Sequence, residues 1–74
     1  MIQVGSIVAG NERSFPAIGG KIGIVISFSD KYRNNPSRDY VNRWKIYWFE
    51  SDVRIRFPLK TSVFLERWLT VIVP

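Results

Sequence analysis

Apolar and polar residues alternate along much of this chain, which is the pattern of strands that bury one of their two faces. Residues 40–49 show it most clearly, because Trp44, Ile46 and Trp48 alternate there with other residues. Clusters of Gly, Pro, Asn and Asp interrupt the alternation and mark loops at residues 10–20 and 30–39. The pattern predicts strands at residues 4–9, 21–29, 40–49, 53–59 and 69–73, with a short helical turn over residues 62–67.

The alternation also predicts which side chains share a face, because successive residues of a strand point to opposite sides. In strand 40–49, both tryptophans and Ile46 turn into the domain. The outward face of the same strand carries Arg43, Lys45 and Tyr47. In strand 21–29, one face collects Ile22, Ile24, Ile26 and Phe28.

Residues 50–52 are too few for any connection but a hairpin between the third and fourth strands. If the numbers of paired residues sum to 103, Trp48 lies opposite Ile55 and Ile46 lies opposite Phe57. A slip by one residue would place an arginine opposite Trp48, so we expect the register to be firmly set.

Five short antiparallel strands in 74 residues predict a single all-β domain spanning residues 1–74. The expected architecture is a small five-stranded antiparallel barrel, closed or half-closed, with one short helical turn before the last strand. Closure would remove exposed sheet edges, through which a chain rich in aromatic residues can aggregate.

Side-chain chemistry argues against most enzyme classes. The chain has neither cysteine nor histidine, so thiol nucleophiles, cysteine-based zinc sites and the commonest general base are missing. The nearest acidic pair, Glu50 and Asp52, flanks the expected hairpin tip, where a solvated turn is favoured over a metal or acid–base site. We therefore expect no enzyme activity, no catalytic residue, no metal site and no cofactor.

Charge and hydropathy bear on partners and compartment. Eleven Lys and Arg outnumber six Asp and Glu, giving a net charge of +5. Such a charge attracts polyanions or an acidic protein face, or keeps the surface soluble. No apolar run reaches the roughly 18–20 residues that span a bilayer, and the N-terminus lacks signal-peptide features. We expect a protein that is neither secreted nor transmembrane.

The outward face of the third and fourth strands is the main candidate binding surface. It is expected to combine Arg43, Lys45, Tyr47, Arg54 and Arg56. The cations would contact phosphates while the phenol stacks on a base, or the same residues would dock an acidic protein surface. A merely solvated outer face is the third interpretation.

Further candidate binding residues lie outside these two strands. The polar segment 30–39 adds Lys31, Arg33 and Arg38, because long loops often carry recognition residues, although a simple polar connector is also compatible with its composition. Trp68 follows the expected turn and would anchor an interface if it is exposed.

The first third of the chain resembles a KOW motif. Val4-Gly5-Ser6-Ile7-Val8 is similar to the opening strand of that motif, and Gly20-Lys21-Ile22-Gly23-Ile24-Val25 matches its Gly-x-x-Gly-x-Val entry into the next strand. Physically, these glycines let the chain turn sharply and lie close to a neighbouring strand. The resemblance implies a Src-homology-3-like barrel, of a family that often binds RNA, ribosomes or RNA polymerase. A glycine hairpin in any small barrel would show the same pattern.

The second half resembles short uncharacterised barrels of tailed bacteriophages. The resemblance lies in the aromatic run at residues 44–49, in Leu65, and in the closing strand at residues 71–73. It implies a phage origin, with cytoplasmic synthesis in a host cell and association with a virion as one destination. It assigns no functional residue.

Two function hypotheses follow. The first is a non-enzymatic, phage-type binding module that docks on a larger protein assembly, as a virion accessory or decorating subunit or as a modulator of a host complex. The second is a KOW-like nucleic-acid-binding barrel that uses the basic strand face. Phosphate binding weakens by orders of magnitude with salt, whereas an interface anchored by apolar rings responds less. Homo-oligomerisation is compatible with either hypothesis, and no membrane partner is expected.

Overall fold

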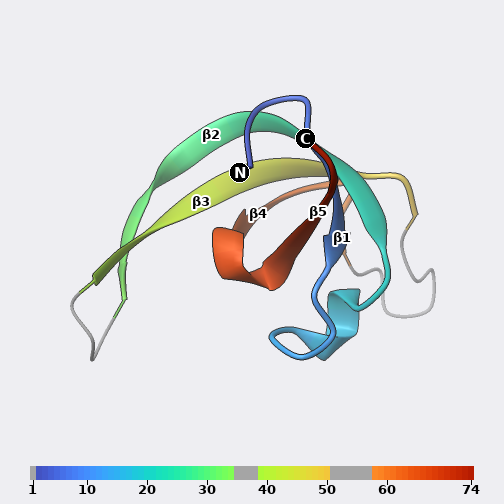
Figure 1. Ribbon diagram of the computed structural model, residues 1–74, viewed down its shortest axis with the longest axis horizontal. Helices are drawn as coiled ribbons and strands as arrows, with labels where there is room; N and C mark the ends of the chain where they lie inside the picture. Colours follow the sequence, from blue (N-terminus) through green and yellow to red (C-terminus); the bar gives the residue numbers. More distant parts are fainter. Residues whose placement is uncertain (1, 35–38, 51–57) are drawn as a thin grey trace.

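Five antiparallel strands and two short 3-10 turns make up the described part of the chain (Figure 1). The computed structural model describes residues 2–34, 39–50 and 58–74. In chain order, the elements are β1 (Ile7–Gly10), η1 (Pro16–Ile18), β2 (Ile22–Asn34), β3 (Asp39–Trp48), β4 (Thr61–Leu65), η2 (Glu66–Trp68) and β5 (Leu69–Val73). The predicted all-β class, the five antiparallel strands and the turn before the last strand are confirmed.

The strands form one curved sheet with the order β4-β3-β2-β1-β5. Among the described residues, β4 pairs with β3 and β5 pairs with β1, and no ladder joins these two edge strands. The sheet is therefore not closed into a barrel, contrary to the closure expected from the sequence. In Figure 1, β2 and β3, with 13 and 10 residues, arch past the five-residue strands β4 and β5 and project as a two-stranded ribbon.

The described strand that follows β3 is β4, which lies later in the chain than the predicted segment 53–59. Of that segment only Pro58 and Leu59 are described, and neither belongs to a strand. The predicted register, with residue numbers summing to 103, falls outside the described residues. In the described chain, β3 pairs with β4, with Ile46 opposite Ser62.

The helical turn predicted over residues 62–67 is also corrected. Residues 61–65 are extended as β4, and only η2 adopts helical geometry. Thr61 and Val63 are β-branched and favour strands, and β4 pairs with β3 along its whole length. The first predicted strand is shifted too, because β1 begins at Ile7 after a turn at Gly5.

The loop predicted at residues 30–39 is largely strand. β2 continues to Asn34 and β3 starts at Asp39. Extended backbone thus includes Lys31 and Arg33, which were expected on a loop. Because successive residues of a strand point to opposite faces, the position of each residue in β2 decides which face of the sheet its side chain is on.

Two bulges in β2 disrupt its predicted alternation: the first reverses the faces of residues 27 and 28, and the second restores the original alternation from Asp30 onwards. The register with β3 shifts after Val25 and again after Phe28, and each shift leaves one residue of β2 without a partner. Ile24 lies opposite Tyr47, on the outer face of the sheet. Phe28 lies opposite Trp44, on the inner face. The four apolar residues predicted to share one face of β2 are therefore divided between two faces.

The core lies on the inner face and is rich in aromatic side chains. Ile46 and Trp48 are buried, as the alternation in strand 40–49 predicts. The Phe64 ring packs edge-on against Trp48, with ring centroids 5.5 Å apart. The other buried members of the cluster are Ile2, Val8, Ile18, Val25 and Leu69. Burial of these side chains supplies the main stabilisation of so small a domain.

The Gly-x-x-Gly-x-Val segment meets the two physical requirements inferred for it. Gly20 has a φ of +76°, a left-handed conformation that a side chain would strain, and it turns the chain into β2. At Gly23, a Cβ atom would lie 2.7 Å from Ile46 Cγ2 and 2.8 Å from the Tyr47 carbonyl oxygen. The second glycine therefore permits close approach of β2 and β3.

Candidate functional site

An ion pair occupies the outer face of the β2–β3 hairpin. Arg43 donates from Nε to Oδ1 of Asp30 and from Nη2 to Oδ2, each at 2.6 Å. The two residues are directly opposite across the ladder. The guanidinium carbon also lies 5.0 Å from the centroid of the Tyr32 ring, within the range of a cation–π interaction.

This pairing changes the chemistry available to Arg43. Its hydrogen bonds hold the pKa of Asp30 below the ordinary value, and the same bonds raise the pKa of the guanidinium. Both groups are consequently charged at neutral pH, and each compensates the other. Arg43 is thus less available to an incoming phosphate than the sequence alone would suggest.

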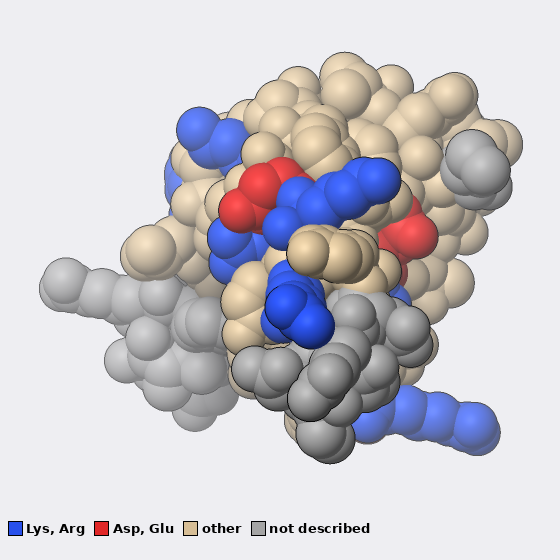
Figure 2. Space-filling model, turned by 90° about the vertical axis from the view of Figure 1, so that its left-hand side faces the viewer, with Lys and Arg blue, Asp and Glu red and all other residues tan. Residues whose placement is uncertain are grey.

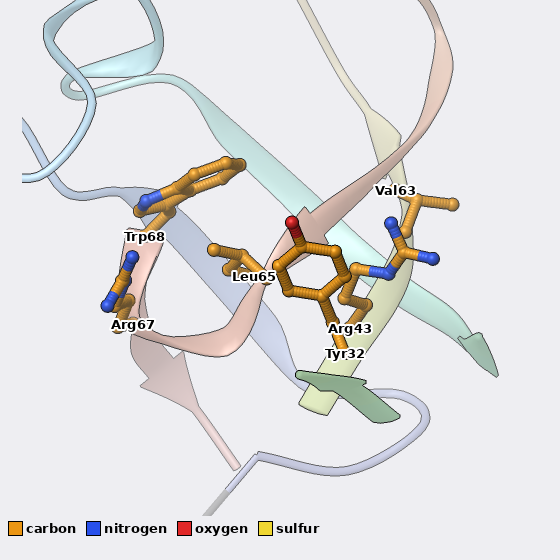
Figure 3. A pocket seen from close by; sticks show the side chains of 6 residues that line it. All are labelled: Tyr32, Arg43, Val63, Leu65, Arg67 and Trp68. Atoms are coloured by element: carbon orange, nitrogen blue, oxygen red, sulfur yellow. The ribbon is translucent and has the colours of Figure 1, made fainter. Parts of the chain in front are cut away.

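A cleft opens beside this pair, between the hairpin and η2 (Figure 3). Its volume is about 400 Å³, and the side chains that line it are Tyr32, Arg43, Val63, Leu65, Arg67 and Trp68. Leu65 is only 6% exposed and does not belong to the main core cluster. Figure 3 shows Leu65 between the Tyr32 and Arg43 side chains and those of Arg67 and Trp68. The cleft thus combines an apolar floor with aromatic and cationic walls.

Three local features position the cleft. The β3–β4 ladder places Leu65 opposite Arg43. The Trp44 indole Nε1 donates to Glu66 Oε1 at 2.9 Å, which ties η2 to β3. The Trp68 ring packs against Phe15, with centroids 4.9 Å apart. The last two contacts hold η2, and with it the cleft residues Arg67 and Trp68, against the rest of the domain.

A second surface runs across the outer face of the sheet. The ladders place Val73 opposite Ile7, Ile7 opposite Ile24, and Ile24 opposite Tyr47. The Phe49 ring extends this line, since its centroid lies 6.1 Å from that of Tyr47. Val73, Tyr47 and Phe49 are 52%, 39% and 56% exposed, respectively. We call these five residues the cross-sheet row.

The outward set predicted on the third strand is divided between the two surfaces. Lys45 and Tyr47 are exposed on the outer face, and Arg43 is half-buried in its ion pair. Lys45 lies opposite Ser27 and Val63, between the cleft and the cross-sheet row. Their predicted neighbours Arg54 and Arg56 lie outside the described residues.

The other predicted binding residues have different positions. Lys31 and Arg33 are exposed on β2, and they alternate with Asp30 and Tyr32, so they lie on the opposite face from the ion pair. Arg38 lies outside the described residues. Trp68 is half-buried in the cleft wall rather than a fully exposed anchor.

Four residues of the cleft were not identified as site residues from the sequence: Tyr32, Val63, Leu65 and Arg67. The polar segment around Tyr32 predicts a loop, and the helical turn predicted over residues 62–67 gives Leu65 no position beside β3. The β-branched residues Thr61 and Val63 are the signal that could have placed this segment in an extended strand.

Basic and acidic side chains are interspersed at the end of the molecule formed by the β2–β3 hairpin. Figure 2 shows several Lys and Arg side chains there, with carboxylates among them. Within the described ranges, no group of three or more acidic residues is placed to hold a metal ion, and no helix is long and apolar enough to cross a membrane. The described part of this end of the molecule therefore carries charges of both signs.

Comparisons with protein-family models, with curated proteins and with solved structures found no match. The function must therefore be argued from these surfaces themselves.

Proposed function

We propose that this chain is a non-enzymatic binding module that docks on a larger protein assembly through the cross-sheet row. The row itself carries the proposal: four adjacent strands place apolar side chains in register on one face, and three of its five members are exposed. Contiguous exposed apolar surface marks protein interaction sites, and aromatic residues such as Tyr47 and Phe49 are enriched at their centres.

The charge distribution supports a protein partner over a nucleic acid. Binding to a phosphate backbone requires several free cations along a track. Arg43 is engaged by Asp30, and the cross-sheet row contains no charged residue. Lys45 borders the row on β3. We therefore expect the partner to present an apolar surface bordered by acidic residues.

The strand arrangement supports the KOW resemblance drawn from the sequence. β5 lies beside β1, and η2 precedes β5, which is compatible with an open form of the Src-homology-3-like arrangement implied by the KOW resemblance. The resemblance to small proteins of tailed bacteriophages favours a virion, or a host complex that the protein modulates, as the assembly.

The proposal is tested by comparing partner capture by the native chain and by a row variant, Tyr47→Ser/Val73→Ser. Each tagged protein is incubated with a lysate of the cells that produce it, with and without nuclease, at low salt and at about 0.5 M salt, where exposed charges are largely screened. We expect the native chain to retain a partner protein under all conditions and the row variant to retain at least tenfold less, because it has lost two apolar anchors.

Val4→Ser is the matched control, because it removes an exposed valine in the turn before β1, outside the row. It should capture the partner as the native chain does. Thermal unfolding of all variants checks that the row substitutions leave the fold intact. Loss of capture after nuclease treatment, or equal capture by a folded row variant, would refute the proposal and favour nucleic-acid binding or another surface.

A further inference from the structure

The cleft beside the cross-sheet row has the dimensions and lining of a site for one large side chain. Its volume of about 400 Å³ lies within the usual range of ligand pockets. Leu65 forms an apolar floor, and the Tyr32 and Trp68 rings contribute to its walls. An apolar side chain that enters here would exchange water for contact with three apolar groups.

The cleft also holds nitrogen donors that remain available to a ligand. Arg67 is exposed and makes no ion pair with any described residue. The indole nitrogen of Trp68 donates to no described residue, and Figure 3 shows it on the edge of the ring that faces Arg67. The carboxylate of Glu66 already accepts from Trp44. One uncompensated cation and one N–H group are thus offered at the rim.

We propose that the cleft binds an acidic peptide segment, with one apolar side chain on Leu65 and a neighbouring carboxylate on the Arg67 guanidinium. A carboxylate matches a guanidinium in charge and geometry. The Trp68 indole provides a further donor to the same group.

A peptide carboxylate fits this cleft better than a nucleic-acid backbone does. A phosphate track would find Arg43 already engaged by the Asp30 carboxylate and by the Tyr32 ring. Successive phosphates each require a cation, whereas a single carboxylate beside an apolar side chain requires only one.

The cleft and the cross-sheet row are parts of one continuous surface. Arg43, Lys45 and Tyr47 alternate along the outer face of β3, so Lys45 lies between the cleft and the row. A partner segment that crosses the row reaches the cleft within the length of this strand. This inference rests on the proposed function, because the peptide segment is taken to belong to the partner that docks on the cross-sheet row. It adds the chemistry of that segment, an apolar side chain beside a carboxylate.

The test uses three synthetic peptides, acetylated and amidated at their ends. The first has a central phenylalanine flanked by two acidic residues on each side, the second replaces the acids with their amides, and the third replaces the phenylalanine with alanine. Binding to the full chain is followed by amide chemical shifts in NMR spectra. We expect the first peptide to bind about tenfold more tightly than either of the others, with the largest shifts in residues 61–68.

Two variants locate the carboxylate contact. Arg67→Gln should weaken binding of the first peptide about fivefold, and Trp68→Phe, which keeps a ring but removes the N–H group, about threefold. Arg13→Gln is the matched control, since it removes the same charge from an exposed position in the loop after β1. It should leave the affinity within a factor of two.

The outcomes separate this inference from the proposed function. Equal weakening by Arg67→Gln and Arg13→Gln, equal binding of the amide peptide, or tighter binding of a thymidine oligonucleotide at residues 61–68 would overturn the cleft proposal. If the peptides fail while the row variant still loses its partner protein, only the cleft inference falls. If the row variant also retains its partner, the proposed function falls as well.

Discussion

Asp30 and Arg43 are brought together by the two bulges of β2. At the start of the β2–β3 ladder, paired residue numbers sum to 71, as for Gly23 and Trp48. Without the bulges this sum would place Phe28 opposite Arg43. Each bulge raises the sum by one, so that Arg43 meets Asp30 and forms two hydrogen bonds of 2.6 Å with it.

Stability should depend on pH through Asp30. Its folded-state pKa is lowered by the hydrogen bonds from Arg43, so its contribution to stability is fully present above the unfolded-state pKa of about 3.9. The contribution is lost as pH falls through the lower folded-state pKa. We expect native and Asp30→Asn proteins to differ in urea unfolding at pH 7 and to converge towards equal stability in acid.

The double-mutant cycle with Arg43→Gln is the control for this effect. In that background the carboxylate has no guanidinium to pair with, so Asp30→Asn should change stability little at any pH. Because the side chains of Arg43 and Asp30 are 35% and 47% exposed, solvent screens the pair and the effect in the native background should be modest. A difference between native and Asp30→Asn that stays constant down to the acid range would contradict the assignment.

Close approach of β2 and β3 predicts that Gly23→Ala is destabilising. The added Cβ would lie 2.7 Å from Ile46 Cγ2 and 2.8 Å from the Tyr47 carbonyl oxygen, both in the packed sheet. Overpacking of this kind costs about 1–3 kcal/mol, measurable as a lower urea midpoint. Gly20→Ala meets no atom within 4 Å, but its φ is +76°, so backbone strain alone should cost about 1–2 kcal/mol. Gly20→Asn should recover part of that loss, whereas Gly23→Asn should recover none.

The inward face of β3 could be predicted from sequence because its alternation is unbroken. Trp44, Ile46 and Trp48 share one side, and burial of Ile46 and Trp48 follows from the period of two. The all-β class followed from the same alternation in the other strands. Local pattern is sufficient where a strand has no irregularity.

The distal half of β2 could not be predicted in the same way. Its apolar residues alternate without a break from Ile22 to Phe28, so nothing in the local pattern marks a bulge. The first bulge lets Phe28 pack edge-on against Trp44, with ring centroids 5.2 Å apart, on the inner face. This contact depends on the partner strand. The Asp30–Arg43 pair and the cleft wall formed by Tyr32 and Arg43 depend on both bulges, so the sequence pattern did not predict them either.

The buried indole of Trp48 predicts a specific effect of substitutions at Ser62. Trp48 is 1% exposed, and its Nε1 donates to Ser62 Oγ at 3.1 Å. Ser62→Ala would leave this N–H group without its acceptor, which costs about 1–3 kcal/mol. Ser62→Thr keeps the hydroxyl and suits a strand, so it should retain most of the stability in urea unfolding. If Ser62→Ala unfolds at the native urea concentration, the hydrogen bond contributes nothing to stability.

The hydrogen bond between Trp44 and Glu66 predicts a link between the position of η2 and peptide binding in the cleft. Glu66→Gln and Glu66→Ala both remove one negative charge near the cleft, so charge affects the affinity of an acidic peptide equally in the two variants. Only Gln retains an oxygen that can accept from Trp44 Nε1. We expect Glu66→Gln to bind the acidic phenylalanine peptide at least as tightly as the native chain. Glu66→Ala should bind it about threefold more weakly than Glu66→Gln and lose about 1 kcal/mol of stability. Equal affinities of the two variants would show that this bond does not position the cleft.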